Sequence, residues 1–279
     1  MAKRSKQKGK KPKQEILMIL VEGETDELAF EYPIEAFINK YASDVKIIYS
    51  RLSRDRDGNE VPGGDSTSDY GIYPGNFDEE ISNRVMKDLT RFEGVYPKYI
   101  VKVIQIVDMD GAYIDDNKIV IKHTDDGMWA DGVFYADDEI EVDHIESVAK
   151  RHRRKQTNLD YLCGKTSIKL HTTTVPYSVY FNSCNLEHFL WGDRNTPNNQ
   201  KRGKAIEFSE KCQDDDSFFE SVIYGEYALA GKDYKESWDY VQDRTTTNSL
   251  SRCSNLHLML EDLKAWAIAR AAESAEQVE

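Results

Sequence analysis

Two short apolar runs, each followed at once by acidic residues, constrain the fold of this chain more than any other feature. The first run, residues 16–21, precedes Glu22, and the second, residues 100–107, precedes Asp108 and Asp110. Runs of this length and apolar content are typical of buried strands. Because polar groups at the carboxyl ends of parallel strands converge on one crevice, these three carboxylates are expected to lie together.

The converging carboxylates predict a site for a divalent metal ion. Three or four acidic oxygen donors at one place favour Mg²⁺ or Mn²⁺, and ions held in this way usually act on phosphate esters. Asp26 lies one helical turn beyond Glu22 and is a candidate ligand, although an acid favoured by the dipole at a helix start explains it equally well. Glu187 follows the last predicted strand and could be an outer ligand, whereas its neighbour His188 is more often structural than functional in such a place.

The rest of the pattern alternates strands and helices, which is the order typical of a parallel α/β sheet. Hydrophobic spacing predicts strands and helices as follows: strands at residues 15–21, 45–49, 100–108 and 175–181, and helices from Thr25, over 78–92 and over 139–155. Pro33 is expected to interrupt or kink the first helix.

Three further segments are predicted from composition and spacing. Residues 51–77 are rich in Gly, Asp, Ser and Pro and are expected to form a long loop, and residues 112–135 are expected to form a hairpin. A polar linker or lid at 193–203 leads into a helical C-terminal region, 193–279. This region ends in a long amphipathic helix, whose apolar stripe either covers the core or docks a partner.

Charge is distributed unevenly along the chain. The net charge is −13, yet residues 1–13 hold seven Lys and Arg side chains, so the remainder carries −20. The basic segment reads as a disordered tail, with a nucleic-acid-binding arm as the alternative of equal weight. A body this acidic repels nucleic acid unless a local basic surface or metal ions intervene.

One local basic surface is predicted at the end of the third helix, where residues 150–155 read KRHRRK. Basic side chains favour the C-terminal end of a helix through its dipole, but six such residues exceed what capping needs. A solvated helix face is the bland alternative. We expect contacts with the phosphate backbone of a nucleic acid from Lys150, Arg151, Arg153, Arg154 and Lys155.

The strand-end motifs resemble the Toprim domain. Residues 21–26 (VEGETD) and the later Asp108-Met109-Asp110 are similar to the glutamate after the first strand and the D-x-D after the third strand of that family. Its members include topoisomerases, bacterial primases and nucleases, and Asp26 matches an added acid of the overcoming-lysogenization-defect type nucleases. Residues 180–191 are similar to a segment of small Toprim proteins in phage-defence loci. The resemblance covers roughly residues 14–192 and implies a Toprim-like parallel sheet flanked by helices.

This resemblance implies a Mg²⁺- or Mn²⁺-dependent endonuclease that hydrolyses phosphodiester bonds of DNA or RNA, including tRNA. Glu22, Asp108 and Asp110 would be its catalytic residues, and the same three with Asp26 and Glu187 would be its metal ligands. The implied role is an anti-phage (antiviral) defence effector. The chain lacks an intact nucleotide-binding loop, so control by a partner ATPase, or by a homo-oligomer that hides the crevice, is expected.

Composition narrows the alternatives. The chain has no stretch of ~18 apolar residues and no visible signal peptide, which predicts a cytoplasmic protein without membrane spans. The four cysteines form no C-x-x-C pair, which argues against the zinc module of a primase, and 279 residues are too few for the strand-passage domains of a topoisomerase. The competing interpretation is a non-catalytic nucleic-acid-binding or scaffold protein with a Toprim fold.

Overall fold

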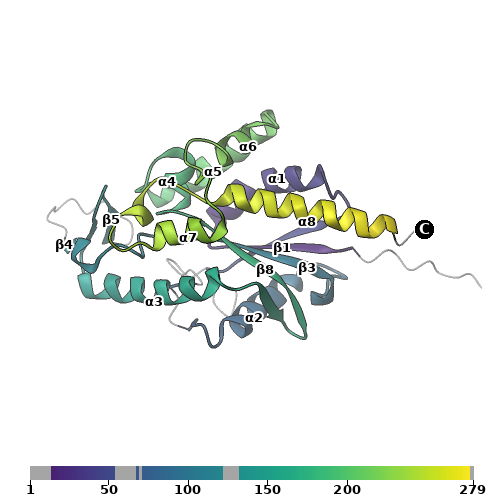
Figure 1. Ribbon diagram of the computed structural model, residues 1–279, viewed down its shortest axis with the longest axis horizontal. Coiled ribbons are helices and arrows are strands. Elements are labelled where there is room, and N and C mark those ends of the chain that lie inside the picture. Colours follow the sequence, from purple (N-terminus) through teal and green to yellow (C-terminus); the bar gives the residue numbers. More distant parts are fainter. Residues whose placement is uncertain (1–13, 54–66, 69–70, 122–131, 277–279) are drawn as a thin grey trace, which may run out of the picture.

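The computed structural model describes residues 14–53, 67–68, 71–121 and 132–276, and a mostly parallel five-stranded sheet forms its centre (Figure 1). The strand order is β2-β1-β3-β8-β7. The first four of these strands are parallel, and β7 runs antiparallel to β8. The strands are β1 (Ile16–Val21), β2 (Lys46–Arg51), β3 (Ile100–Asp108), β7 (Ser167–Leu170) and β8 (Thr173–Asn182). The predicted α/β class with a parallel sheet is thereby confirmed.

Helices cover both faces of the sheet, which explains why the inner strand β1 is apolar and buried along its whole length. Successive side chains of a strand point to opposite faces, so Met18 and Leu20 belong to one core cluster, and Leu17 and Ile19 to the other. The first cluster includes residues of α2 (Phe77–Leu89), α3 (Ile145–Cys163) and α7 (Tyr234–Gln242). The second includes residues of α1 (Glu24–Asn39), α4 (Leu186–Trp191), α5 (Asn198–Asp214), α6 (Phe218–Ile223) and α8 (Leu256–Glu276). Helix α1 continues through Pro33, so the expected interruption is absent.

A small second sheet replaces the predicted hairpin. It consists of β4 (Ile119–Ile121), β5 (Val133–Tyr135) and β6 (Ile140–Val142) in the order β4-β6-β5. Both strands that fall within 112–135 pair with β6 and not with each other, and residues 122–131 lie outside the described residues. The helix predicted from residue 139 starts only at Ile145, because β6 takes the first residues of that segment.

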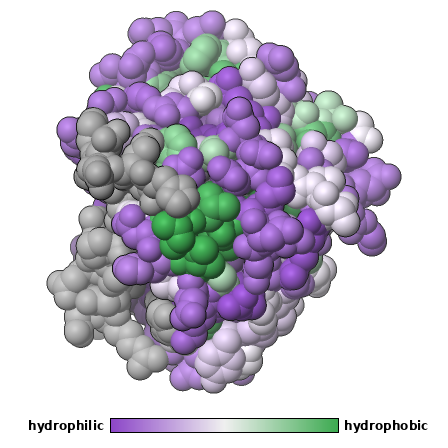
Figure 2. Space-filling view, turned by 90° about the vertical axis from the view of Figure 1, so that its left-hand side faces the viewer, coloured by the Kyte–Doolittle hydropathy of each residue, from purple (hydrophilic) through white to green (hydrophobic). Residues whose placement is uncertain are grey.

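Figure 2 views the end of the molecule that carries β4 and β5, and it shows an apolar patch bordered by hydrophilic side chains. On these elements and the first turn of α3, Ile121 is exposed, whereas Val133 and Ile145 are partly buried over a third core cluster. The small sheet therefore has its own apolar core beside the main sheet.

The C-terminal helices belong to the main core. Leu256, Leu260, Leu263 and Ala267 of α8 are all fully buried against the second face of the sheet. The apolar stripe of the last helix thus covers the protein's own core, and a partner cannot dock on it. The predicted linker at 193–203 is shorter than expected, because α5 begins at Asn198.

Besides the hairpin segment, two predicted segments fall wholly or partly outside the described residues. These are the basic tail, 1–13, and much of the loop at 51–77, of which only 51–53, 67–68 and 71–77 are described. No helix in the described ranges is long and apolar enough to cross a membrane.

Candidate functional site: a carboxylate cluster at the edge of the sheet

The carboxyl ends of β1, β3 and β8 bring acidic residues from distant parts of the sequence to one edge. Asp108 ends β3 and pairs in register with Asn182, the last residue of β8. Glu22 follows β1 directly, and its carboxylate accepts a hydrogen bond from the Asp108 backbone N–H at 3.2 Å. The structure therefore places Glu22 beside Asp108, as expected for strands that end at the same edge.

The turn after β3 brings Asp110 back toward the same edge. Asp110 and Gly111 both have left-handed backbone conformations, with φ of 49° and 66°. Asp tolerates this region better than most residues, and glycine has no penalty there. A Cβ atom on Gly111 would lie 2.6 Å from Leu250 and 2.7 Å from Ile140, so this position requires glycine twice over. Gly23, by contrast, has extended backbone and does not need the conformational freedom of glycine.

Asp26 and Glu187 complete the cluster from two helix starts. Asp26 lies in the first turn of α1, is 8% exposed, and accepts a hydrogen bond from the Gly23 N–H at 2.8 Å. Burial, opposed by this hydrogen bond and reinforced by the nearby Glu187 charge, raises the pKa of Asp26 to about 6. Glu187 lies in the first turn of α4 and is buried. The two carboxylates are therefore close enough to repel each other.

Asp108 lies at the centre of this repulsion. Burial raises the pKa of Asp108 well above its usual value, and the charges of Asp26, Asp110 and Glu187 raise it further. Four of the five carboxylates predicted as metal ligands, Asp26, Asp108, Asp110 and Glu187, thus repel one another, and Glu22 adjoins them through its hydrogen bond to the Asp108 N–H. A buried group of like charges is unfavourable unless protons or cations compensate it.

Two lysines supply part of that compensation, and one of them corrects a prediction. Lys155 was expected on a nucleic-acid-binding surface, but its side chain is 1% exposed and its ammonium lies 2.5 Å from Asp110 and 3.7 Å from Glu22. Lys201 of α5 lies 3.1 Å from Glu187. Burial opposes the charged form of Lys201, but Glu187, Asp108 and Asp110 outweigh it and raise its pKa.

Two neutral side chains hold the aspartates in place. The Asn182 amide donates to Asp108 Oδ1 at 3.1 Å, and the Tyr135 hydroxyl donates to Asp110 Oδ1 at 3.3 Å. Asn182 Oδ1 is buried and makes no hydrogen bond within the described part of the chain. Neither residue was predicted, because a tyrosine and an asparagine at strand ends carry no motif of their own.

The donor set suits Mg²⁺ or Mn²⁺ by its chemistry, since it consists of carboxylates and an amide oxygen, without sulfur or imidazole. Among the described residues, however, no three acidic, histidine or cysteine side chains surround one point as metal ligands would. Asp110, the carboxylate nearest Lys155, is held by that ammonium and by Tyr135. Metal binding would therefore require side-chain movement within the cluster.

The remaining residues of the predicted basic run lie at or near the surface of α3. Lys150 and Arg153 are exposed, and Arg151 and Arg154 are partly buried. Arg153 pairs with Asp116 at 2.7 Å, and Arg154 donates to the Ser68 carbonyl at 2.6 Å. Burial and the charge of Asp110, which its hydroxyl contacts, raise the pKa of Tyr135 well above its usual value, and the charge of Arg151 opposes this shift. The basic run thus adjoins the carboxylate cluster.

His188 is buried beside Arg194. Arg194 donates to its Nε2 at 3.2 Å, while its Nδ1 is buried without a hydrogen-bond partner among the described residues. Burial and the charges of Arg194 and Arg252 lower the pKa of His188 to about 4. A ring that is neutral at pH 7 cannot attract a phosphate by charge.

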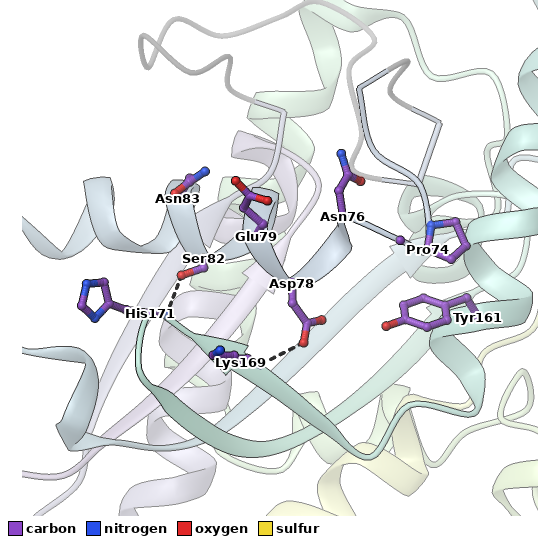
Figure 3. Close-up of a pocket in the computed structure, with 10 residues that line it drawn as sticks. Pro74, Asn76, Asp78, Glu79, Ser82, Asn83, Tyr161, Lys169 and His171 are labelled. Atoms are coloured by element: carbon purple, nitrogen blue, oxygen red, sulfur yellow. Dashed lines mark hydrogen bonds between the residues drawn. The ribbon is translucent and has the colours of Figure 1, made fainter.

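A separate groove lies between α2, the end of α3 and the turn joining β7 to β8 (Figure 3). Its volume is about 490 Å³, and its lining includes Asp78, Ser82, Tyr161, Lys169 and His171. Asp78 accepts a hydrogen bond from the Lys169 backbone N–H, and Ser82 accepts one from that of His171 (Figure 3). None of the five clustered carboxylates lines this groove, so it is distinct from the candidate site.

A comparison of this chain with models of known protein families, with curated proteins and with solved structures finds no match.

Proposed function

We propose that this chain is a Toprim-like, metal-dependent endonuclease that hydrolyses phosphodiester bonds of DNA or RNA. The observation that carries the proposal is the gathering of Glu22, Asp26, Asp108, Asp110 and Glu187 at the carboxyl edge of the sheet. Glu22 follows β1 directly and the D-x-D begins at the last residue of β3, and the Toprim resemblance implies acidic residues at these two strand ends. The excess negative charge of these buried carboxylates favours the binding of a divalent cation.

The residues then have distinct roles. Asp108, Asp26 and Glu187 would hold Mg²⁺ or Mn²⁺, with Asp110 joining them once its side chain turns. The bound ion would supply positive charge and Lewis acidity at the scissile phosphate. Glu22 lies beside Asp108 and is 14% exposed, so it can still exchange protons with a substrate or solvent as general acid or base. Arg151, Arg153 and Arg154 would hold the phosphate backbone next to the cluster.

The resemblance extends this proposal to the biological setting. We infer an anti-phage defence effector whose activity is restrained by a partner ATPase, because an unrestrained cytoplasmic nuclease would injure its host. The buried stripe of α8 is not the docking surface for such a partner. A partner would then have to bind an exposed surface elsewhere on the protein.

A second candidate function is a non-catalytic nucleic-acid-binding or scaffold protein with the same fold. The observation that favours it is the Lys155 ammonium inside the cluster, together with the absence of three converging metal ligands among the described residues. In that case the ion pairs would be structural, and the carboxylates would not need a metal ion.

A cleavage assay separates the two candidates. The purified protein is incubated with plasmid, single-stranded DNA or tRNA in Mg²⁺, Mn²⁺ or EDTA, beside the variants Glu22→Gln and Glu24→Gln. Glu24 follows on the same turn but is 41% exposed and pairs with Arg202, so its variant is the matched control. The nuclease proposal expects cleavage that needs a metal, that Glu22→Gln loses and that Glu24→Gln keeps. Binding without cleavage under all conditions would support the scaffold instead.

A further inference from the structure

Lys155 lies where a helix would be expected to bury an apolar side chain. It belongs to the buried face of α3, between His152 and Leu159, and its side chain is 1% exposed. A lysine is rarely buried to this extent unless it is paired with a charge. Here the ammonium reaches both Asp110 and Glu22, which come from the ends of two different strands.

The helix around Lys155 is fixed to the turn that carries Asp110. The next residue, Gln156, donates to the Ala112 carbonyl just after that turn. Tyr113 donates to Asp160 at 2.7 Å, one helical turn farther along α3. The backbone of Lys155 therefore cannot move away from the cluster without breaking these contacts, and only its side chain can swing.

We propose that Lys155 is a resident cation that competes with the divalent metal ion for the carboxylates of Asp110 and Glu22. The inference rests on the metal centre of the proposed function and gives a positioning role to Lys155, for which the basic run predicted a nucleic-acid contact. The ammonium keeps the two carboxylates together when no metal is bound. A bound metal replaces it there, so the side chain of Lys155 turns away as the metal enters.

This role has a consequence opposite to that of a metal ligand. Removal of a ligand weakens metal binding, whereas removal of a competing positive charge strengthens it. At the separations seen here, one charge in a partly buried site changes the affinity for a divalent ion by at least about tenfold. We therefore expect the Lys155→Met variant to bind Mn²⁺ at least about tenfold more tightly than the wild type.

The test is Mn²⁺ titration by calorimetry, with thermal unfolding as a second readout. Lys155→Met should have a lower melting temperature than the wild type without metal, since two carboxylates lose their counter-charge, and should gain more from added Mn²⁺. The matched control is Lys165→Met. The side chain of Lys165 is also largely buried, with 12% of it exposed. Its ammonium lies 2.8 Å from Asp78, outside the cluster. Its loss should leave Mn²⁺ affinity unchanged.

Several outcomes would overturn the proposal. One is weaker or equal Mn²⁺ binding by Lys155→Met, and another is an equal gain in affinity by Lys165→Met. Should Lys155→Met fail to fold, Lys155→Gln, which keeps a hydrogen-bond donor, must show the same tighter Mn²⁺ binding. Failure of both variants to fold even in Mn²⁺ would also contradict the proposal. Tighter binding without nucleic-acid cleavage would keep the proposal and reject the nuclease. Metal-dependent cleavage by the wild type, without tighter Mn²⁺ binding by Lys155→Met, would keep the nuclease and reject the role of Lys155.

Discussion

At the residue scale, Asp26 shows that burying a carboxylate in this cluster lowers the stability of the metal-free protein. Its pKa is raised from 3.8 to about 6, chiefly by burial. A carboxyl group whose pKa is higher in the folded than in the unfolded chain favours folding at low pH and opposes it once both states are ionised. The metal-free protein should therefore lose stability as the pH rises from about 4 to about 6.

The variant Asp26→Asn should remove this penalty. At pH 7.5 without metal we expect it to raise the free energy of unfolding, by at most about 3 kcal/mol, because one pKa unit corresponds to about 1.36 kcal/mol. At pH 4 the gain should vanish, since wild-type Asp26 is then protonated. Thermal denaturation at the two pH values, with Glu24→Gln as control, measures the effect. A variant that is less stable than the wild type at both values would show that Asp26 is a structural residue.

Gly111 offers a second test at this scale. Its left-handed backbone and the 2.6 Å approach to Leu250 mean that Gly111→Ala adds backbone strain to overpacking. We expect a loss of about 2–4 kcal/mol in the free energy of unfolding. Gly94→Ala is the matched control, because Gly94 has a φ of 77° but no atom within 4 Å of its missing Cβ. Urea denaturation should give the control only the smaller backbone part, and equal losses would refute the packing argument.

Sequence reasoning found the five carboxylates but misread Lys155, and the reason is physical. Strand-end acids are visible because apolar runs mark where strands stop, and parallel pairing brings those ends together. Lys155 stands in a run of basic residues that suggests a surface, but Val148, His152, Lys155, Leu159 and Leu162 recur at helical spacing on one buried face. The helical spacing of these residues predicts that Lys155 lies on the buried face of α3, although the local charge suggests a surface.

At the scale of elements, α8 is fixed to the sheet by a partly buried polar network as well as by apolar packing. Lys102 of β3 is 6% exposed, and its ammonium lies 3.0 Å from Asp262 of α8. The Tyr180 hydroxyl of β8 donates to the same carboxylate at 2.8 Å. Removal of Asp262 would leave the Lys102 charge buried without compensation.

The variant Asp262→Ala should therefore destabilise the fold. We expect a loss of about 2–3 kcal/mol in the free energy of unfolding, less than for a fully buried pair because Asp262 is 32% exposed. The double variant Lys102→Met with Asp262→Leu should recover most of the loss, since it buries no charge. Chemical denaturation measures both. If the double variant is no more stable than Asp262→Ala, the network owes its effect to something other than the buried charge.

The elements themselves were predicted unevenly. The strands β1 and β3 were predicted from apolar runs, because both of their faces pack against a core. The helices α2 and α8 were predicted from apolar residues at helical spacing, because one face of each packs against a core. The small sheet did not, because each of its strands has only three residues, too few for a period-two pattern to be distinguished from a helix turn. Its pairing order depends on contacts between segments far apart in sequence.

At the scale of the whole molecule, an acidic body carries the basic run of α3 beside its carboxylate cluster. Replacement of Arg151, Arg153 and Arg154 with Ala should weaken nucleic-acid binding and flatten its dependence on salt, by about one unit of slope per lost phosphate contact. Binding measured at several salt concentrations checks this. Replacement of Lys211 and Lys235, exposed lysines paired within α5 and α7, is a control that removes two positive charges outside the basic run. Equal slopes for all variants would leave the basic run a solvated helix face.

The central claim is that the carboxylate edge holds a divalent metal ion, and an anomalous difference map from crystals grown with Mn²⁺ tests it most directly. The proposal expects a Mn²⁺ peak within about 2.0–2.6 Å of a carboxylate oxygen of Asp108, with at least one more ligand from Asp26, Asp110, Glu187 or Glu22. Crystals of Asp108→Asn should lose the peak. A map without a peak at this edge, with Lys155 still bound to Asp110, would contradict the claim.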